Sequence, residues 1–226
     1  MFVDILSYIR VGISAFQKAL QKLRYTFRRH NLVGHTFGIK PNRNYLRVAV
    51  FGLVNTQDDL FKIKSAYDRQ SYPNKQLFLF KGDETHSHKE LQTDILPLTR
   101  FGKELEGKFD YIACLSVAHY YGANYLMDLV ASARQASVSA IGKSAFYSCS
   151  EGLPIYHEGL GAFRLMDKIQ ADRAIFASHL LTIVDPRAAS QGEQWFTRLP
   201  CLSIDAHHFC ADWNGEDLSG IDGLVI

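Results

Sequence analysis

The sequence predicts an α/β domain with a mostly parallel sheet and helices on both faces, preceded by an amphipathic N-terminal helix. From residue 46 onward, short apolar runs rich in β-forming residues alternate with helical patterns. Such strand–helix alternation is typical of a parallel sheet covered on both faces. The composition, 47% hydrophobic and 21% charged, is that of a globular protein.

Residues 1–31 are predicted to form one basic amphipathic helix. Apolar side chains recur every three or four positions, at Ile5, Ile9, Ile13, Phe16, Leu20, Leu23 and Phe27. The segment has six basic side chains and one acid, a net charge of +5, so the remainder must carry −3 to give the total of +2. Two interpretations stay open for residues 1–30: binding to an anionic membrane surface, or packing against a partner protein or the chain's own domain. Residues 32–44 lack periodicity and are predicted to be a linker.

The α/β domain is predicted over residues 45–226. Its first elements are a buried strand at 46–54, a helix at 58–70, a turn at 72–75, a strand at 76–80, a loop with a short helix at 93–101 and a strand at 111–115. A helix at 124–133 follows, with Asn124 as its predicted cap, and then a strand at 138–147 that breaks near Gly142. The last predicted elements are strands at 162–166 and 173–177, a short helix at 193–198 and a strand at 201–204.

Several functional classes are not indicated. The four cysteines form no Cys-x-x-Cys pair, and three lie beside apolar residues, which favours buried free thiols and a cytoplasmic location over a disulfide scaffold. No signal peptide is expected, and no apolar stretch approaches the ~20 residues that span a bilayer. Because the basic charge is confined to the N-terminal segment, nucleic-acid binding is not predicted.

Three segments together resemble family 2 glycosyltransferases. Residues 70–77 (QSYPNKQL) are similar to the link between the first helix and the second strand of that family. Residues 108–113 (KFDYIA) and 120–129 (YYGANYLMDL) resemble the surroundings of the family's metal motif, as in bacterial transferases of capsule and teichoic-acid-type polymers. Residues 140–147 (AIGKSAFY) resemble the strand that follows.

The resemblance implies a GT-A-like, Rossmann-type fold. A nucleotide-sugar donor would then bind at the carboxyl ends of the parallel strands, the usual ligand site of an open α/β sheet. It also implies a role in bacterial surface-polysaccharide biosynthesis.

The metal motif of the family is missing from this sequence. Family members hold Mg²⁺ or Mn²⁺ with an Asp-x-Asp motif after the third strand, since carboxylates suit these cations and the metal neutralises the diphosphate. The corresponding residues 115–121 (LSVAHYY) contain no carboxylate, and His119 is their single candidate ligand. We therefore expect no divalent-metal site.

The remaining candidate site residues follow from the same resemblance. Asn55, Lys81, Asp83 and Lys143 are the predicted donor contacts, with Lys81 at the place of a family aspartate near the base. Glu193 is the candidate general base, because residues 191–196 (QGEQWF) resemble the start of the family's base-bearing helix. His119 is the second candidate catalytic residue. The basic residues Arg164, Lys168 and Arg173 are interpreted as surface charge, with phosphate contact as the alternative.

Three functional hypotheses stay open at this point. The first is a catalytically impaired glycosyltransferase-like domain that acts as a binding or scaffold domain. The second is an active, metal-independent sugar transferase, in which Lys81, His119 and Arg100 or Lys103 supply the positive charge that a metal normally gives. The third is a non-enzymatic interaction module anchored by residues 1–30, at a partner protein or the inner face of the membrane.

Overall fold

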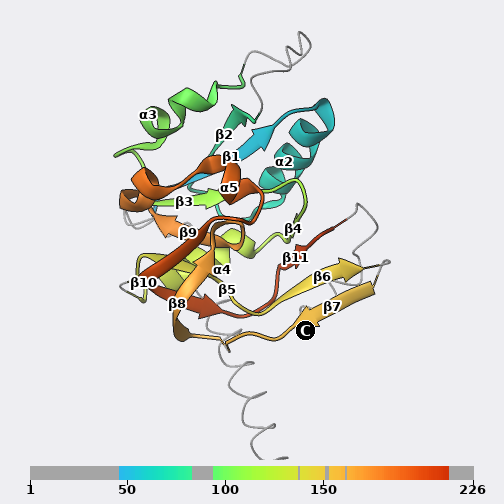
Figure 1. Ribbon diagram of the computed structural model, residues 1–226, viewed down its shortest axis with the longest axis vertical. Coiled ribbons are helices and arrows are strands. Elements are labelled where there is room, and N and C mark those ends of the chain that lie inside the picture. The colour runs from blue at the N-terminus through green and yellow to red at the C-terminus, as the bar shows by residue number, and fades with distance from the viewer. Residues whose placement is uncertain (1–45, 83–93, 137, 151–152, 161, 214–226) are drawn as a thin grey trace, which may run out of the picture. The chain divides into compact units, whose positions relative to one another are not determined.

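The computed structural model describes residues 46–82, 94–136, 138–150, 153–160 and 162–213 (Figure 1). The chain divides into two units, Met1–Tyr45 and Leu46–Ile226, and the described residues all belong to the second. The predicted N-terminal helix, the linker and the candidate donor contact Asp83 therefore lie outside the described residues. Within these ranges, no helix is both long and apolar enough to cross a membrane.

A seven-stranded sheet forms the centre of the domain (Figure 1). Its order is β2 (Lys75–Lys81), β1 (Val48–Val54), β3 (Tyr111–Cys114), β9 (Ala174–Ala177), β5 (Ala140–Lys143), β10 (Trp195–Ile204) and β8 (Arg164–Gln170). Strands β2, β1, β3, β5 and β10 run in one direction, whereas β9 and β8 run in the other. The predicted α/β class is confirmed, and two reversed strands make the mostly parallel sheet a mixed one.

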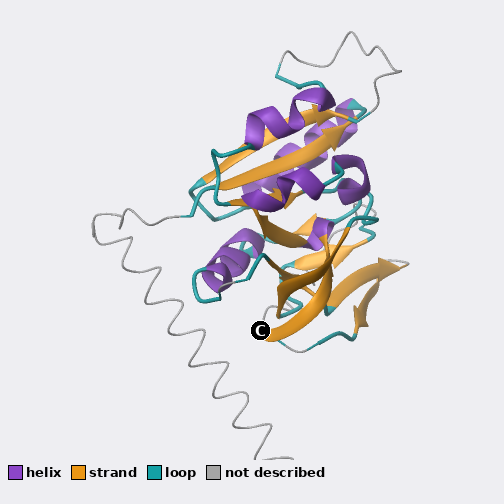
Figure 2. Ribbon diagram, turned by 60° about the vertical axis from the view of Figure 1, so that its left-hand side comes forward, coloured by secondary structure: helices purple, strands orange, loops and turns teal. Residues whose placement is uncertain are grey.

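Helices cover both faces of the sheet, as predicted (Figure 2). Successive side chains of a strand point to opposite faces, and β1 uses both. On one face Gly52 lies against Ile63 of α2 (Gln57–Arg69), so closely that a Cβ at Gly52 would lie 2.7 Å from Ile63. On the other, the Phe51 ring packs edge-on against Phe101 of α3 (Phe101–Leu105) at 4.9 Å. The core on this second face also contains residues of η3 (Ser178–Ile183) and α5 (Pro186–Ser190).

Local signals explain why α2 begins where it does. The Thr56 side chain accepts a hydrogen bond from the backbone N–H of Asp59, and the Asp59 carboxylate accepts one from the N–H of Thr56. This reciprocal capping box satisfies two helix-end donors. The start of α4 (Tyr125–Ala133) differs from prediction: Asn124 precedes it but makes no side-chain cap, because its Oδ1 accepts a hydrogen bond from Ser71.

A second, four-stranded sheet was not predicted. Its order is β4 (Tyr120–Tyr121), β11 (Phe209–Ala211), β6 (Phe146–Ser150) and β7 (Leu153–His157). The single strand predicted at 138–147 is therefore two strands in two sheets, β5 and β6, separated by Ser144 and Ala145. Gly142 lies inside β5 and not at the break. A side chain there would place its Cβ 2.6 Å from the backbone oxygen of Arg173, so glycine permits this close packing.

The helix predicted at 193–198 is also wrong. Residues from Trp195 belong to β10, which pairs with β5 on one side and with β8 on the other. Phe196 is buried opposite Ile169 of β8. Because this pairing joins residues distant in sequence, the local helical pattern is overridden by tertiary contacts. The helix of this region is α5, which ends at Ser190.

Candidate functional site

His119 lies in the turn after β3 and is bonded to an aspartate that the sequence did not single out. Its Nε2 lies 2.9 Å from Oδ2 of Asp172, a residue of the 3-10 helix η2 (Ala171–Arg173). Both side chains are nearly buried, with 10% and 6% exposed. The two residues are 53 positions apart, so only the fold brings them together.

The hydrogen bonds of the His119 ring define its tautomer. The backbone N–H of Asp212 donates to Nδ1 at 3.3 Å, which requires an unprotonated nitrogen there. Nε2 therefore carries the proton and donates it to Asp172. With both ring nitrogens engaged, His119 can act as a ligand or a base only after one of these bonds breaks.

Two tyrosines complete this buried cluster. The Tyr121 hydroxyl accepts from the backbone N–H of Ser116 at 3.0 Å and donates to the backbone oxygen of Asp172 at 2.9 Å. The Tyr125 ring packs against Tyr121 at 4.9 Å. Burial raises the pKa of both hydroxyls well above the usual value of 10.0, and the nearby Asp172 raises them further. Both tyrosines are therefore neutral at ordinary pH; Tyr121 bonds the turn through its hydroxyl, whereas the Tyr125 hydroxyl has no hydrogen-bond partner among the described residues.

The carboxyl ends of β1 and β2 bring two predicted donor contacts together. Val54 pairs with Lys81, so Asn55 and Lys81 end neighbouring strands. A Cβ at Gly82 would lie 2.6 Å from the Asn55 side-chain oxygen, which shows how tightly Asn55 packs against this turn. Arg187 of α5 reaches the same edge, where its Nε donates to the Gly82 backbone oxygen at 3.1 Å. No sequence pattern singles out Arg187.

Lys143 lies elsewhere, at the end of β5. Its side chain is fully buried, and Nζ donates to the Asp205 backbone oxygen at 2.9 Å and lies 3.4 Å from Oδ1 of the same residue. Its ammonium group is thus bound by Asp205, the residue that follows β10, inside the fold. Nearby, His208 Nε2 lies 3.7 Å from Asp128, and burial lowers the pKa of His208 while Asp128 opposes that shift.

Glu193, the predicted base, is exposed in the turn between α5 and β10. Its backbone N–H donates to Ala188 at 2.8 Å, which closes the end of α5. Because Glu193 lies in a turn and not at a helix start, the helix dipole that was expected to favour its charge is absent.

The described residues offer few candidate ligands for a metal ion. They contain no group of three or more His, Cys, Asp or Glu side chains placed to hold an ion. The stretch that carries aspartates in family 2 enzymes contributes His119 alone, whose ring nitrogens are both hydrogen-bonded. The residues present do not fit a divalent cation here.

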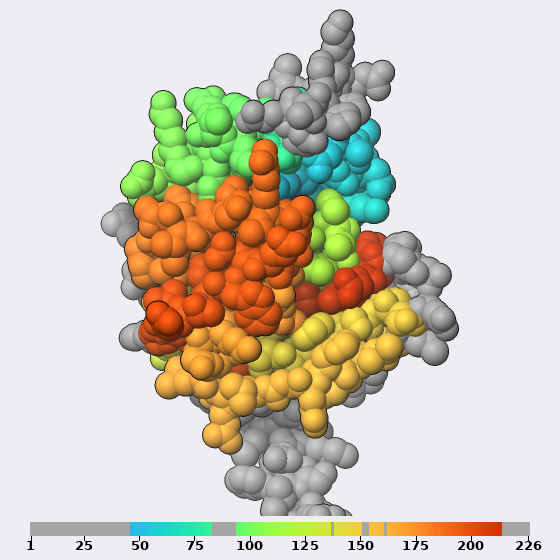
Figure 3. Space-filling model, in the orientation of Figure 1, coloured from blue at the N-terminus to red at the C-terminus, as the bar shows by residue number. Residues whose placement is uncertain are grey.

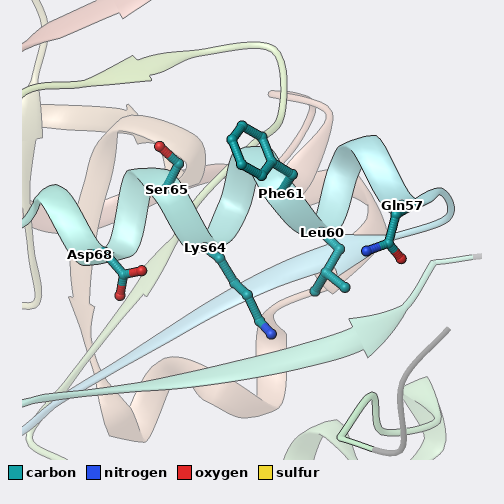
Figure 4. Close-up of a pocket in the computed structure, with 6 residues that line it drawn as sticks. All are labelled: Gln57, Leu60, Phe61, Lys64, Ser65 and Asp68. Carbon is teal, nitrogen blue, oxygen red and sulfur yellow. The ribbon is translucent and has the colours of Figure 1, made fainter.

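Two hollows lie away from the predicted donor edge. One, of about 470 Å³, runs along α2, and all six of its labelled residues lie on that helix (Figure 4). The other, of about 260 Å³, lies between β6, β7 and the end of β10; it is lined by Ala145, Tyr147, Tyr156, Leu160, Ala162, Ile204, Asp205, Ala206 and His207. Neither includes Asn55, Lys81 or His119 in its lining.

No family model matches this sequence, and no curated protein sequence matches it. Similar solved structures include S. aureus TarS 1-349, at 9% identity and a TM-score of 0.47, covering 74% of this chain and 60% of that chain. The same protein in complex with UDP-GlcNAc matches at 10% identity and 0.47, covering 76% and 60%. A longer S. aureus TarS structure matches at 12% identity and 0.46, covering 79% and 39%.

This chain therefore spans less than two thirds of each of these neighbours. The TM-scores of all three matches lie below 0.5. The mixed seven-stranded sheet with helices on both faces confirms the predicted α/β class.

Proposed function

We propose that this chain is a divergent glycosyltransferase-like domain of bacterial surface-polysaccharide biosynthesis that is catalytically impaired and acts as a binding or scaffold domain. The observation that carries the proposal is the state of His119. It is the single candidate ligand in the stretch where the family places its aspartates, and Asp172 and Asp212 occupy both of its ring nitrogens.

The other predicted site residues support the same proposal. The ammonium group of Lys143 is bonded to Asp205 inside the fold, which leaves it poorly placed to meet a diphosphate. Glu193 is an exposed turn residue without the helix start that was expected to hold it. The sheet is fully formed, but the candidate site residues make hydrogen bonds within the fold or lie in an exposed turn. Such a domain can keep the fold of an enzyme without its activity, since fold alone does not give function.

A second candidate function, a metal-independent transferase that uses a nucleotide-sugar donor, is favoured by one observation. Lys81 and Arg187 both lie at the carboxyl ends of β1 and β2, beside Asn55. Two cations at this edge could stabilise a leaving diphosphate without a metal. On this alternative, His119→Ala and Glu193→Gln each lower the turnover by at least about tenfold.

Calorimetric titration of the full chain with UDP-, CDP- and GDP-linked sugars, with and without Mn²⁺, tests these proposals. The impaired domain predicts no metal-dependent binding of any donor. Binding without metal, weakened by Lys81→Gln and unchanged by the exposed control Lys62→Gln, would favour the metal-independent transferase. Metal-dependent binding would refute the proposal. If no donor binds, the impaired scaffold domain remains the best account, and its protein partners become the next object of study.

A further inference from the structure

Arg173 is a buried arginine whose guanidinium group has no acceptor among the described residues. Only 9% of its surface is exposed, and its Nε is a fully buried donor without a hydrogen-bond partner in that part of the chain. The sequence favoured an ordinary surface charge here, and the structure instead places the residue at the end of η2, inside the fold. A buried charge without a hydrogen-bonded partner is costly.

The outer edge of this guanidinium group remains accessible. Among the described residues, Nε is the one Arg173 nitrogen that is both fully buried and unpartnered. No hydrogen bond joins Nη1 or Nη2 to an acceptor in the same residues, and neither nitrogen is among their fully buried unpartnered atoms, so the described residues do not close them off. They present a planar pair of donors, which is the geometry that binds the two oxygens of a carboxylate or phosphate.

Two aromatic rings hold this guanidinium group in place. Its central carbon lies 4.1 Å from the Phe146 ring centre, over the face of the ring, and 5.9 Å from that of Trp195. Such contacts stabilise a cation without neutralising it. Trp195 is itself 40% exposed, so an apolar surface borders the charged edge.

A second cation contacts the same tryptophan ring as Arg173. Lys168 Nζ is 5.4 Å from the Trp195 ring centre. In the β8–β10 ladder, Trp195 pairs with Gln170 and Thr197 pairs with Lys168. Trp195 and Thr197 are two residues apart on β10 and therefore point to the same face of the sheet. Lys168 lies directly opposite Thr197 and points to that face as well, so Trp195 and Lys168 project from the same side. The space-filling view shows this C-terminal part of the chain, in orange, over the middle of one face (Figure 3).

The neighbouring Asp172 is not the ion-pair partner of Arg173. Asp172 Oδ2 is bonded to His119, and Asp172 acts on Arg173 through space, with no direct ion pair between the two side chains. Burial lowers the pKa of Arg173, and Asp172 and Tyr125 partly oppose the shift, yet an arginine remains charged at ordinary pH. Its positive charge is therefore held in place with no acceptor for its two outer donors among the described residues.

We propose that Arg173, Lys168, Trp195 and Phe146 form an oxyanion-binding patch, which takes the phosphate or carboxylate group of a ligand. The Arg173 edge binds two oxygens, Lys168 adds a second positive charge, and Trp195 packs against the part of the ligand next to the anion. This patch does not depend on nucleotide-sugar binding at the β1–β2 edge, because the two sites share no residue.

Calorimetric titration of the full chain at low ionic strength tests the patch, with inorganic phosphate, glycerol 1-phosphate, glucuronate and neutral glucose as probes. We expect the anionic probes to bind and glucose not to bind. Comparison of the phosphate probes with glucuronate identifies which oxyanion the patch prefers. Arg173→Gln is expected to weaken binding by at least about tenfold, the loss expected for a charge-assisted hydrogen bond. Arg173→Lys keeps the charge but loses the paired donors, and is expected to weaken binding by less.

Two further variants keep the test informative if a change at Arg173 disturbs folding. Lys168 is exposed, so Lys168→Gln should fold normally and still bind anions several-fold more weakly. Arg47, whose guanidinium group also lies over a phenylalanine ring at 5.1 Å, is exposed and provides the matched control Arg47→Gln, which should leave binding unchanged. The proposal is overturned if no anionic probe binds the wild-type chain, or if binding is unaffected in both Arg173→Gln and Lys168→Gln.

Discussion

Asp172 and Arg173 are consecutive residues of η2, both buried and both charged, and they differ in how the fold uses them. Asp172 points to the turn after β3, where its carboxylate accepts a hydrogen bond from His119. Arg173 points to the second sheet and the start of β10, where it meets aromatic rings and no acceptor among the described residues. Asp172 is hydrogen-bonded through Oδ2 while its Oδ1 has no partner among the described residues, whereas the Arg173 guanidinium has no acceptor there at all.

The comparison teaches that the identity of a polar residue says little about its chemical capacity until its partners are known. His119 was selected as catalytic because it stands where the family has aspartates, yet its hydrogen bonds are already made. Arg173 is predicted to be a surface charge, yet it is buried and its Nε has no hydrogen-bond partner among the described residues. Unsatisfied buried groups are uncommon in folded proteins, so each one calls for an explanation.

Removing the closed interaction is expected to have the largest effect. Asp172→Ala leaves the buried Nε2–H of His119 without its acceptor, and we expect a loss of about 2–3 kcal/mol in the free energy of unfolding, as for hydrogen bonds to charged groups. Urea unfolding followed by fluorescence measures it. Asp167→Ala, at an exposed position on β8, is the matched control and should change stability little. Equal losses in both variants would contradict a special role for the His119–Asp172 bond.

Removing the charge of Arg173 should not lower the free energy of unfolding, in contrast to the change at Asp172. Arg173→Met keeps most of the side-chain volume and removes a buried, unpartnered cation, so stability should stay unchanged or rise by up to about 1 kcal/mol. The same urea titration checks this, with Arg164→Met, exposed on β8, as control. A loss above about 2 kcal/mol would mean that Arg173 is a structural residue whose charge the fold itself uses.

The smallest expected effect is a pH dependence that involves a third buried group. Burial lowers the pKa of His208, so the unfolded chain binds a proton there more readily than the folded chain. The stabilisation from a neutral His208 is therefore present above its unfolded pKa, near 6.5, and is lost as the pH falls towards the folded value. Between pH 7 and pH 5.5 we expect the melting temperature of the wild type to fall by about 1–3 °C more than that of His208→Gln. His179→Gln, at an exposed position, should behave as the wild type, and parallel profiles for all three proteins would count against this account.

Local sequence patterns were sufficient for the first half of the sheet. Continuous apolar runs located β1, β2 and β3, and apolar spacing located α2, in each case within two residues of the observed bounds. The strands contain buried residues on both faces, and the helix is buried along one regular stripe. The positions of their apolar residues therefore predict which positions are buried. Asn55 and Lys81 were also placed correctly at neighbouring strand ends, because parallel strands bring their carboxyl ends to one edge.

Patterns failed where partners come from far along the chain. The sequence assigned a helix to 193–198, but pairing with β5 and β8 makes this segment part of a strand. It also merged β5 and β6, because no local signal reveals that one apolar stretch serves two sheets. Asp172 was overlooked for the same reason: an aspartate followed by an arginine has no distinctive pattern until His119 is brought beside it.

The sequence by itself determined the α/β class, the early strands and helix, and the absence of the family's carboxylates at residues 115–121. Tertiary structure alone decided which polar groups are already bonded and which are not. The physical reason is that hydrophobic periodicity is a local property of the chain, whereas the buried hydrogen bond of His119 joins it to a residue 53 positions away. The hydrogen bonds of His119, and the lack of an acceptor for Arg173 among the described residues, are both decided by the tertiary structure.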